Sequence, residues 1–144
     1  MAACVVIADD LTGANATGVL LSKMQYRATT VMNLSGSRDT LSDCDCLLYP
    51  TDSRGVSPQE AYRRVKEAAQ KLISDKVQLY SKRIDSTLRG NLGSETDAIL
   101  DSLGDDYIAI VAPCFPSSGR VVIGFPSVPS NRTRQSFPRA VNRK

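Results

Sequence analysis

The stretch Cys4–Asn15, with the sequence CVVIADDLTGAN, decides the fold. Its first part, Cys4–Ala8, is a short apolar and β-branched run, which is typical of a strand buried on both faces of a parallel sheet. Asp9 and Asp10 follow where that strand should end, and the Thr12 hydroxyl is placed to cap the next segment. Apolar residues of that segment recur at helical spacing: Ala16, Val19, Leu20 and Met24. The order is therefore strand, acidic loop and helix, and open α/β sheets bind ligands at such positions.

Strand and helix signals alternate along the rest of the chain. Ser57-Pro58-Gln59-Glu60 predicts a helix start, because serine caps, proline suits the first helical position and glutamate completes a capping box. Helices are expected over 57–72 and from about residue 91 to residue 103. Strands are expected at Ala28–Met32, Cys46–Tyr49, Val77–Tyr80 and Tyr107–Ala112, with a short apolar run at Val121–Gly124. This pattern predicts an α/β fold, a three-layer sandwich with a mostly parallel central sheet of about five or six strands.

Polar side chains gather after four of the predicted strands, in residues 9–10, 51–55, 81–91 and 114–120. Because the carboxyl ends of parallel strands meet at one edge of a sheet, we expect these side chains to converge. The basic members can neutralise a carboxylate or a phosphate: Arg54, Lys82, Arg89 and Arg120.

The acidic members of these junctions admit more than one role. Asp9, Asp10, Asp52 and Asp85 can accept hydrogen bonds from sugar hydroxyls. One of them could take the proton of a hydroxyl that attacks a phosphoryl group, or the acids could coordinate Mg²⁺. A structural explanation also exists for each residue, as a turn, a helix cap or an ion pair within the loops, Ser86 and Thr87 included.

Length and composition limit the alternatives. With 144 residues the chain is long enough for one domain with a real core, and 42% hydrophobic and 23% charged residues are ordinary for a soluble protein. No apolar run approaches the roughly 20 residues of a membrane span, and the N-terminus lacks a secretory signal, so we expect a cytoplasmic protein. Residues 125–144 hold five basic and no acidic residues, which leaves thirteen basic against fifteen acidic residues in 1–124. The folded part is thus mildly acidic, and nucleic acid is not an expected partner.

Cysteine and histidine usage excludes several kinds of site. The four cysteines are scattered, so free thiols are expected rather than a disulfide framework. Cys44 and Cys46 form a C-x-C pair, but the chain has no histidine and no second such pair to complete a zinc site. The absence of histidine also excludes the usual Ser-His-Asp and Cys-His nucleophiles.

Four segments closely resemble, in order, the signature segments of the four-carbon acid sugar kinase family: residues 7–15, 51–54, 82–91 and 112–120. Members of that family phosphorylate acids such as D-threonate, D-erythronate or 3-oxo-tetronate with ATP. The resemblance implies that residues 1–124 are the sugar-acid-binding N-terminal kinase domain, incomplete at its end. It also implies ATP and Mg²⁺ as cofactors, bound mainly by a larger C-terminal domain that these residues do not contain. Residues 125–144 match nothing in the family and are expected to be a basic, disordered or frameshifted tail.

The resemblance also implies a set of site residues. It places Asp10, Arg54 and the segment Lys82–Arg89 at the substrate, with Asp9 in the same acidic junction. The predicted substrate-binding residues are Asp9, Asp10, Arg54, Lys82, Asp85, Ser86, Thr87 and Arg89. Asp10 and Asp85 are the predicted catalytic carboxylates, and no metal ligand is predicted. The chain departs from the family at Ala16, where an acid is common, and at Gln25, where glycine is common.

Two classes of function follow. The first is the substrate-binding part of an ATP-dependent kinase for a four-carbon sugar acid, inactive alone because the nucleotide-binding domain is missing. The second is a non-catalytic fragment that binds sugar acids weakly, pairs with a separate nucleotide-binding half, or is a decayed gene product. A third and remoter class is a haloacid-dehalogenase-like phosphatase, which Asp9-Asp10-Leu11-Thr12 faintly resembles. The motif of such a phosphatase needs two acids that are two residues apart, and here Leu11 stands where the second acid would be. The expected partner is a small sugar acid, neither membrane nor nucleic acid, and a sheet ending at Gly124 favours homo-oligomers.

Overall fold

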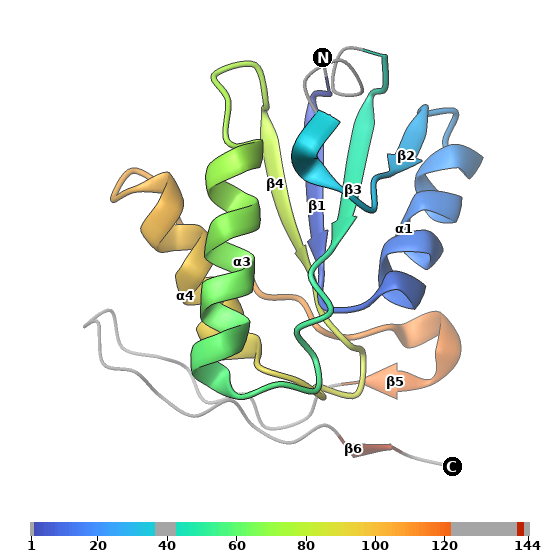
Figure 1. Ribbon diagram of the computed structural model, residues 1–144. Helices are drawn as coiled ribbons and strands as arrows, with labels where there is room; N and C mark the ends of the chain where they lie inside the picture. The colour runs from blue at the N-terminus through green and yellow to red at the C-terminus, as the bar shows by residue number, and fades with distance from the viewer. Residues whose placement is uncertain (1, 37–42, 122–140, 143–144) are drawn as a thin grey trace.

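The computed structural model describes residues 2–36, 43–121 and 141–142. A four-stranded parallel sheet forms its centre, with the strand order β2-β3-β1-β4 (Figure 1). Its strands are β1 (Cys4–Ala8), β2 (Ala28–Thr30), β3 (Cys46–Pro50) and β4 (Leu79–Arg83). The helices around it are α1 (Leu11–Lys23), α3 (Pro58–Leu72) and α4 (Leu92–Leu103), with 3₁₀ turns η1 (Leu34–Gly36) and η2 (Pro116–Ser118). In these described ranges, no helix combines the length and apolarity that crossing a bilayer requires.

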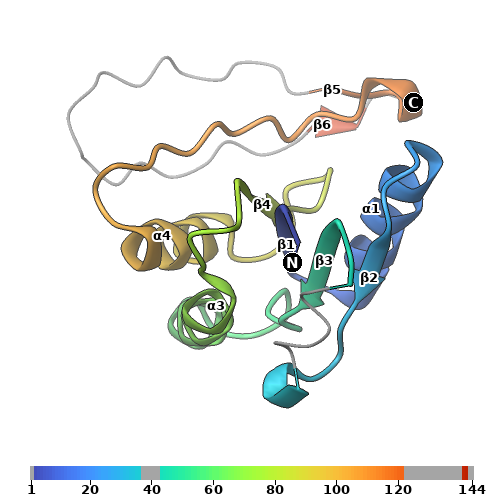
Figure 2. The ribbon, with the colours of Figure 1, turned by 90° about the horizontal axis from the view of Figure 1, so that it is seen from above.

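The helices form two layers, one on each face of the sheet. Helix α1 lies on one side, whereas α3 and α4 lie together on the other (Figure 2). On the α3 and α4 side, Val5 and Ile7 pack with Val65, Leu72 and Ile99. The opposite core is smaller and contains the alternate residues of β1 and β3 with α1: Val6, Ala8, Ala14 and Leu48. The prediction of a three-layer α/β fold is therefore confirmed, with β1 buried on both faces.

Helix α1 is present as predicted, but two details of its prediction are wrong. Its N-cap is Asp10, whose carboxylate accepts a hydrogen bond from the Gly13 amide at 2.6 Å, and not Thr12. Asp10 caps the helix because it lies between the strand and the helix in the extended backbone conformation that an N-cap residue adopts. The apolar residues Val19, Leu20 and Met24 are more than half exposed. The helix packs instead through small residues, which allow it to approach β3 closely.

The predicted strand Tyr107–Ala112 is wrong. This stretch follows α4 as an extended segment that pairs with no strand of the described residues, and the side chains of Ile108 and Ile110 are 86% and 89% exposed. A cavity of about 480 Å³ separates it from β4 and α4. Apolar β-branched sequence predicts burial but does not say which edge the segment will reach. The main sheet therefore has four strands, fewer than expected.

The chain end forms a small second sheet. Strand β5 (Arg120–Val121) pairs antiparallel with β6 (Val141–Asn142). The remainder of the apolar run Val121–Gly124 and almost all of the predicted tail 125–144 lie outside the described residues. Cys4, Cys46 and Cys114 are free thiols, as expected. Burial raises the pKa of the Cys4 thiol to about 11, so it remains protonated and unreactive at neutral pH.

A buried ion pair joins β4 to α4. The Lys82 ammonium lies 2.7 Å from the Glu95 carboxylate and also donates to the Arg83 carbonyl oxygen at 2.8 Å. The two side chains are 8% and 2% exposed, and Glu95 Oε1 has no hydrogen-bond partner among the described residues. Such a pair costs desolvation energy that only close pairing offsets. It fixes the first turn of α4 to the carboxyl end of β4.

We expect Glu95→Leu to lower the free energy of unfolding by about 3 kcal/mol or more, because it leaves the Lys82 charge buried without a partner. Adding Lys82→Met should recover most of the loss, since two apolar side chains then replace the pair. Urea denaturation of both variants measures this. If Glu95→Leu alone changed the free energy of unfolding by less than about 1 kcal/mol, the burial of this pair would be contradicted.

The backbone conformation at the end of α1 can be tested at Gln25, which follows the helix with a φ of 68°. The Gln25 and Tyr26 amides donate to the carbonyl oxygens of Ser22 and Leu21, which is a Schellman motif. A side chain is strained in this left-handed conformation, so Gln25→Gly should raise the free energy of unfolding by about 1 kcal/mol. The same change in the exposed interior of α3, Gln70→Gly, should lower it by about 1 kcal/mol. Equal signs for the two variants in thermal denaturation would refute the assigned backbone conformation.

Candidate functional site

Arg54 joins the two acids at the end of β1. Its Nε and Nη2 donate to the Asp9 carboxylate at 2.7 and 3.0 Å, and its Nη1 lies 2.5 Å from Asp10 Oδ2. The Asp9 side chain is only 3% exposed, whereas those of Arg54 and Asp10 are each 24% exposed. The pKa of Arg54 is raised, first by its hydrogen bonds to Asp9 and further by the nearby charges of Asp10 and Asp85. The Arg54 guanidinium therefore keeps its charge at neutral pH.

Backbone contacts fix the position of Arg54. The amides of Ser53 and Arg54 both donate to the Asp9 carbonyl oxygen, so the segment after β3 folds against the end of β1. Gly90 approaches from the loop after β4 with a φ of 97°. A Cβ at this position would lie 3.3 Å from Arg54 Cγ and 3.5 Å from the Asp9 carboxylate, so the close approach requires glycine. Asn91, beside it, donates to the carbonyl oxygens of Ser53 and Val56.

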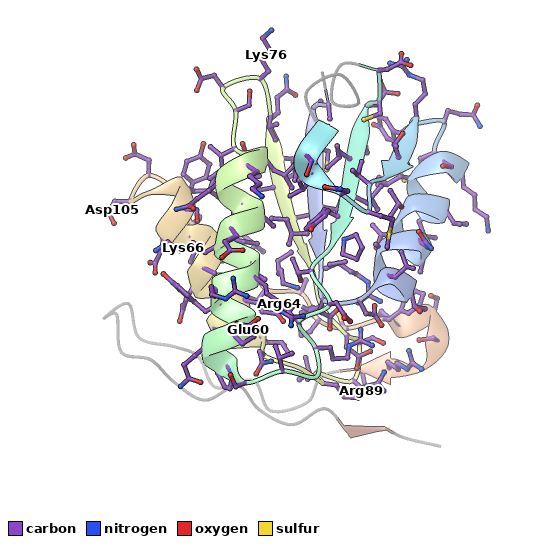
Figure 3. The ribbon with its side chains drawn as sticks, in the orientation of Figure 1. Glu60, Arg64, Lys66, Lys76, Arg89 and Asp105 are labelled. Carbon is purple, nitrogen blue, oxygen red and sulfur yellow. The ribbon has the colours of Figure 1, made fainter. Side chains whose placement is uncertain are left out.

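The loop after β4 has its own charged group. Asp85 accepts from Arg89 Nε at 2.8 Å and Nη2 at 3.1 Å, and its Oδ2 also accepts from the Thr87 hydroxyl and amide. These contacts, the Arg89 guanidinium above all, hold the pKa of Asp85 well below its usual range. The Asp85 side chain is 9% exposed, whereas that of Arg89 is 66% exposed. Arg89 lies at the carboxyl-end side of the sheet, opposite the end marked by Lys76 (Figure 3).

The two charged groups are neighbours. The charge of Asp85 raises the pKa of Arg54. The pKa of Arg89 is lowered by the charge of Arg54 and raised by that of Asp10. The structure thus brings together most residues of the predicted site, from the ends of three strands: Asp9, Asp10, Arg54, Asp85, Thr87 and Arg89. Ser86 lies in the same loop and accepts a hydrogen bond from Arg120 Nη1 at 2.7 Å.

Lys82 does not join this group, because its ammonium group pairs with Glu95 of α4. Its neighbour Arg83 points to the α1 face, where its Cγ and Cζ lie 3.4 and 3.6 Å from the place of a Cβ on Gly13. The predicted substrate segment Lys82–Arg89 includes Arg83, but the sequence reasoning did not single out Arg83 and missed Glu95. Strand alternation contained the signal for Arg83, since neighbouring residues of a strand point to opposite faces.

Metal binding is a second possible role for the acidic residues of the site. Within the described ranges, no group of three or more aspartate, glutamate or cysteine side chains is arranged to hold a metal ion. Asp9 and Asp85 instead direct their oxygens at arginines. This arrangement suits hydrogen bonding to a polar, charged small molecule more than chelation of a cation.

Comparisons with known proteins identify the family of this chain. The model of the family described as the sugar-binding N-terminal domain matches residues 4–125. A D-erythronate kinase from Heliobacterium modesticaldum is 54% identical over 127 residues, covering 86% of this chain and 28% of the relative. A D-threonate kinase from Cupriavidus necator is 39% identical, with coverage of 83% and 28%. For a 3-oxo-tetronate kinase from Haemophilus influenzae the identity is 34%, with coverage of 81% and 29%.

A solved structure supports the fold as well. It is a crystal structure of a Bordetella bronchiseptica protein with bound citrate, described as a domain-swapped dimer. It matches with a TM-score of 0.76 at 30% identity, covering 82% of this chain and 30% of that one. This chain spans less than a third of the length of the relatives it matches. It belongs to the family of sugar-binding N-terminal domains, and its relatives are kinases of four-carbon acid sugars.

Proposed function

We propose that this domain binds a four-carbon sugar acid of the threonate or erythronate type and holds one of its hydroxyls for phosphorylation. The observation that carries the proposal is the convergence of Asp9, Asp10, Arg54, Asp85 and Arg89 at the carboxyl ends of three strands. Carboxylates accept hydrogen bonds from hydroxyls, and the two arginines keep these carboxylates charged and in place, so the cluster suits the hydroxylated part of a sugar acid. The names of the relatives point to the same substrates.

The two predicted catalytic acids differ in how much they are engaged. Asp85 has a lowered pKa and is bound by Arg89 and Thr87, which makes it a weak proton acceptor. Asp10 is more exposed than Asp9 or Asp85. We therefore assign Asp10 to the substrate hydroxyl, as hydrogen-bond acceptor and base, while Asp9 positions Arg54. Asp85 positions Arg89 and the loop that contains Ser86 and Thr87.

Phosphoryl transfer needs more than the acceptor. ATP with Mg²⁺ supplies the phosphoryl group and neutralises its charge, and we assign the binding of both to another domain, as in a kinase several times longer than this chain. The contribution of the described residues is to bind the acid and orient its hydroxyl. We expect the 144-residue chain alone to bind the acid without turning over ATP. The alternative is a non-catalytic domain that binds the acid for another purpose, or together with a separate nucleotide-binding half.

Calorimetric titration with D-erythronate and D-threonate tests the binding, and coupled ADP detection tests the turnover. We expect binding by the parent chain, at least about tenfold weaker binding by Asp10→Asn through loss of a charge-assisted hydrogen bond, and no ADP above background. Asp75→Asn is the matched control, since Asp75 is exposed before β4, far from the site along the strand. No binding of either acid by a folded parent chain would refute the proposal. ADP formed in proportion to added acid would refute the need for another domain.

The state of Asp85 gives a pH test. Because its folded pKa is lowered, the paired carboxylate stabilises the fold fully above the unfolded pKa of about 4, and this contribution is lost as the pH falls through the folded pKa. We expect Asp85→Asn to be less stable than the parent at pH 7, with the difference shrinking at pH 3. Urea denaturation at both values measures it, with Asp75→Asn as control. A difference that is unchanged or larger at pH 3 would show that Asp85 is not held ionised.

A further inference from the structure

Most of the cations near the site already have acidic partners. Arg54 is bound by Asp9 and Asp10, and Arg89 is bound by Asp85. Lys82, predicted to bind substrate, is paired with Glu95 under α4. For any of these three to hold the carboxylate of a ligand, it would have to share or give up an existing charge-assisted pair. The acid group of the substrate therefore needs a different cation.

Arg83 is such a cation. Among the residues that the structure describes, its guanidinium has neither an ion pair nor a hydrogen bond. It is half-buried at the end of β4 and lies against Gly13 in the first turn of α1. The N-terminal turn of a helix is its positive end, where a second positive charge is unfavourable and an anion is favoured. The Asp10 carboxylate, which caps the same turn, offsets part of this charge, and an anion bound beside Arg83 would in addition pair directly with its guanidinium.

Arg120 is a second cation of this kind. It is the first residue of β5, reached after the chain passes the β4 edge at the level of the strands' carboxyl ends (Figure 1). Its Nη1 donates to the Ser86 hydroxyl, a neutral acceptor, and in the described part of the chain no carboxylate lies within 4.0 Å of it. The Ser86 contact places this guanidinium beside the loop after β4, at a residue three positions beyond Arg83. Both uncommitted arginines therefore border the cluster of Asp10 and Asp85.

We propose that Arg83 and Arg120 form the subsite for the carboxylate of the bound sugar acid, while Arg54 and Arg89 keep the aspartates in place. This inference rests on the proposed function and adds which group of the ligand each set of residues recognises. A carboxylate between the two guanidinium groups would gain charge-assisted hydrogen bonds without breaking an existing ion pair. The hydroxylated end of the acid would then face Asp10. The subsite selects acids over the corresponding neutral polyols.

The test compares an acid with its uncharged analogue. The affinities of D-erythronate and erythritol, which lacks the carboxylate, are measured by calorimetry for the parent chain, Arg83→Gln and Arg120→Gln. Lys71→Gln removes one positive charge from an exposed site in α3 and serves as the matched control. We expect each arginine variant to bind D-erythronate about tenfold or more weakly, with erythritol affinity unchanged. Arg83→Lys keeps the charge without the fork and should fall between the parent and Arg83→Gln.

The outcomes separate this inference from the proposed function. If the parent chain binds neither D-erythronate nor D-threonate, the proposed function fails. If the parent binds D-erythronate and both glutamine variants keep its affinity within about twofold, the acid is bound elsewhere and this inference fails. Circular dichroism and thermal denaturation check that each variant is folded. If Arg83→Gln does not fold, Arg83→Lys and Arg120→Gln decide the matter, and parent-like affinity in both overturns the assignment.

Discussion

The bond between Arg54 and the two acids after β1 is the contact on which the rest of the site depends. Asp9 is almost completely buried, and a buried carboxylate is tolerated only when its charge is paired and hydrogen-bonded. Arg54 satisfies it with two parallel hydrogen bonds and reaches Asp10 with its remaining nitrogen. The loop after β4 must then pass directly over this pair, and Gly90 is the residue that makes the passage possible. One guanidinium thus organises the ends of three strands.

Much of the fold could be predicted from local signals. The strand Cys4–Ala8 and the helices after Ser57 and near Asn91 have strong apolar patterns, caps or both, and all three are present. The failures concern tertiary placement. Tyr107–Ala112 has the composition of a buried strand but lies exposed, since pairing depends on where the preceding turn directs the chain. In α1, the exposed apolar residues gave the helical spacing, although small residues make the packed face.

The order of the elements predicted the outline of the site, but it did not predict which side chains pair with each other. Parallel strands bring their carboxyl ends together, so the convergence of Asp10, Arg54 and Asp85 follows from the order of elements. Which cation meets which acid depends on side-chain direction, and one residue of register on β4 separates Lys82 from Arg83. Glu95 carried no signal, because an acid in the first turn of a helix is ordinary. Its role depends on Lys82, the lysine that it meets on β4.

Asp10 belongs to two structures at once. One of its oxygens caps the first turn of α1 through the Gly13 amide, and the other contacts Arg54. A movement of Arg54 is therefore felt at a helix end, where backbone hydrogen bonds open most easily. The exchange of the Gly13 amide proton with solvent consequently reports on the arrangement of the charged cluster. A single carboxylate converts an electrostatic change at the sheet edge into a change of backbone dynamics.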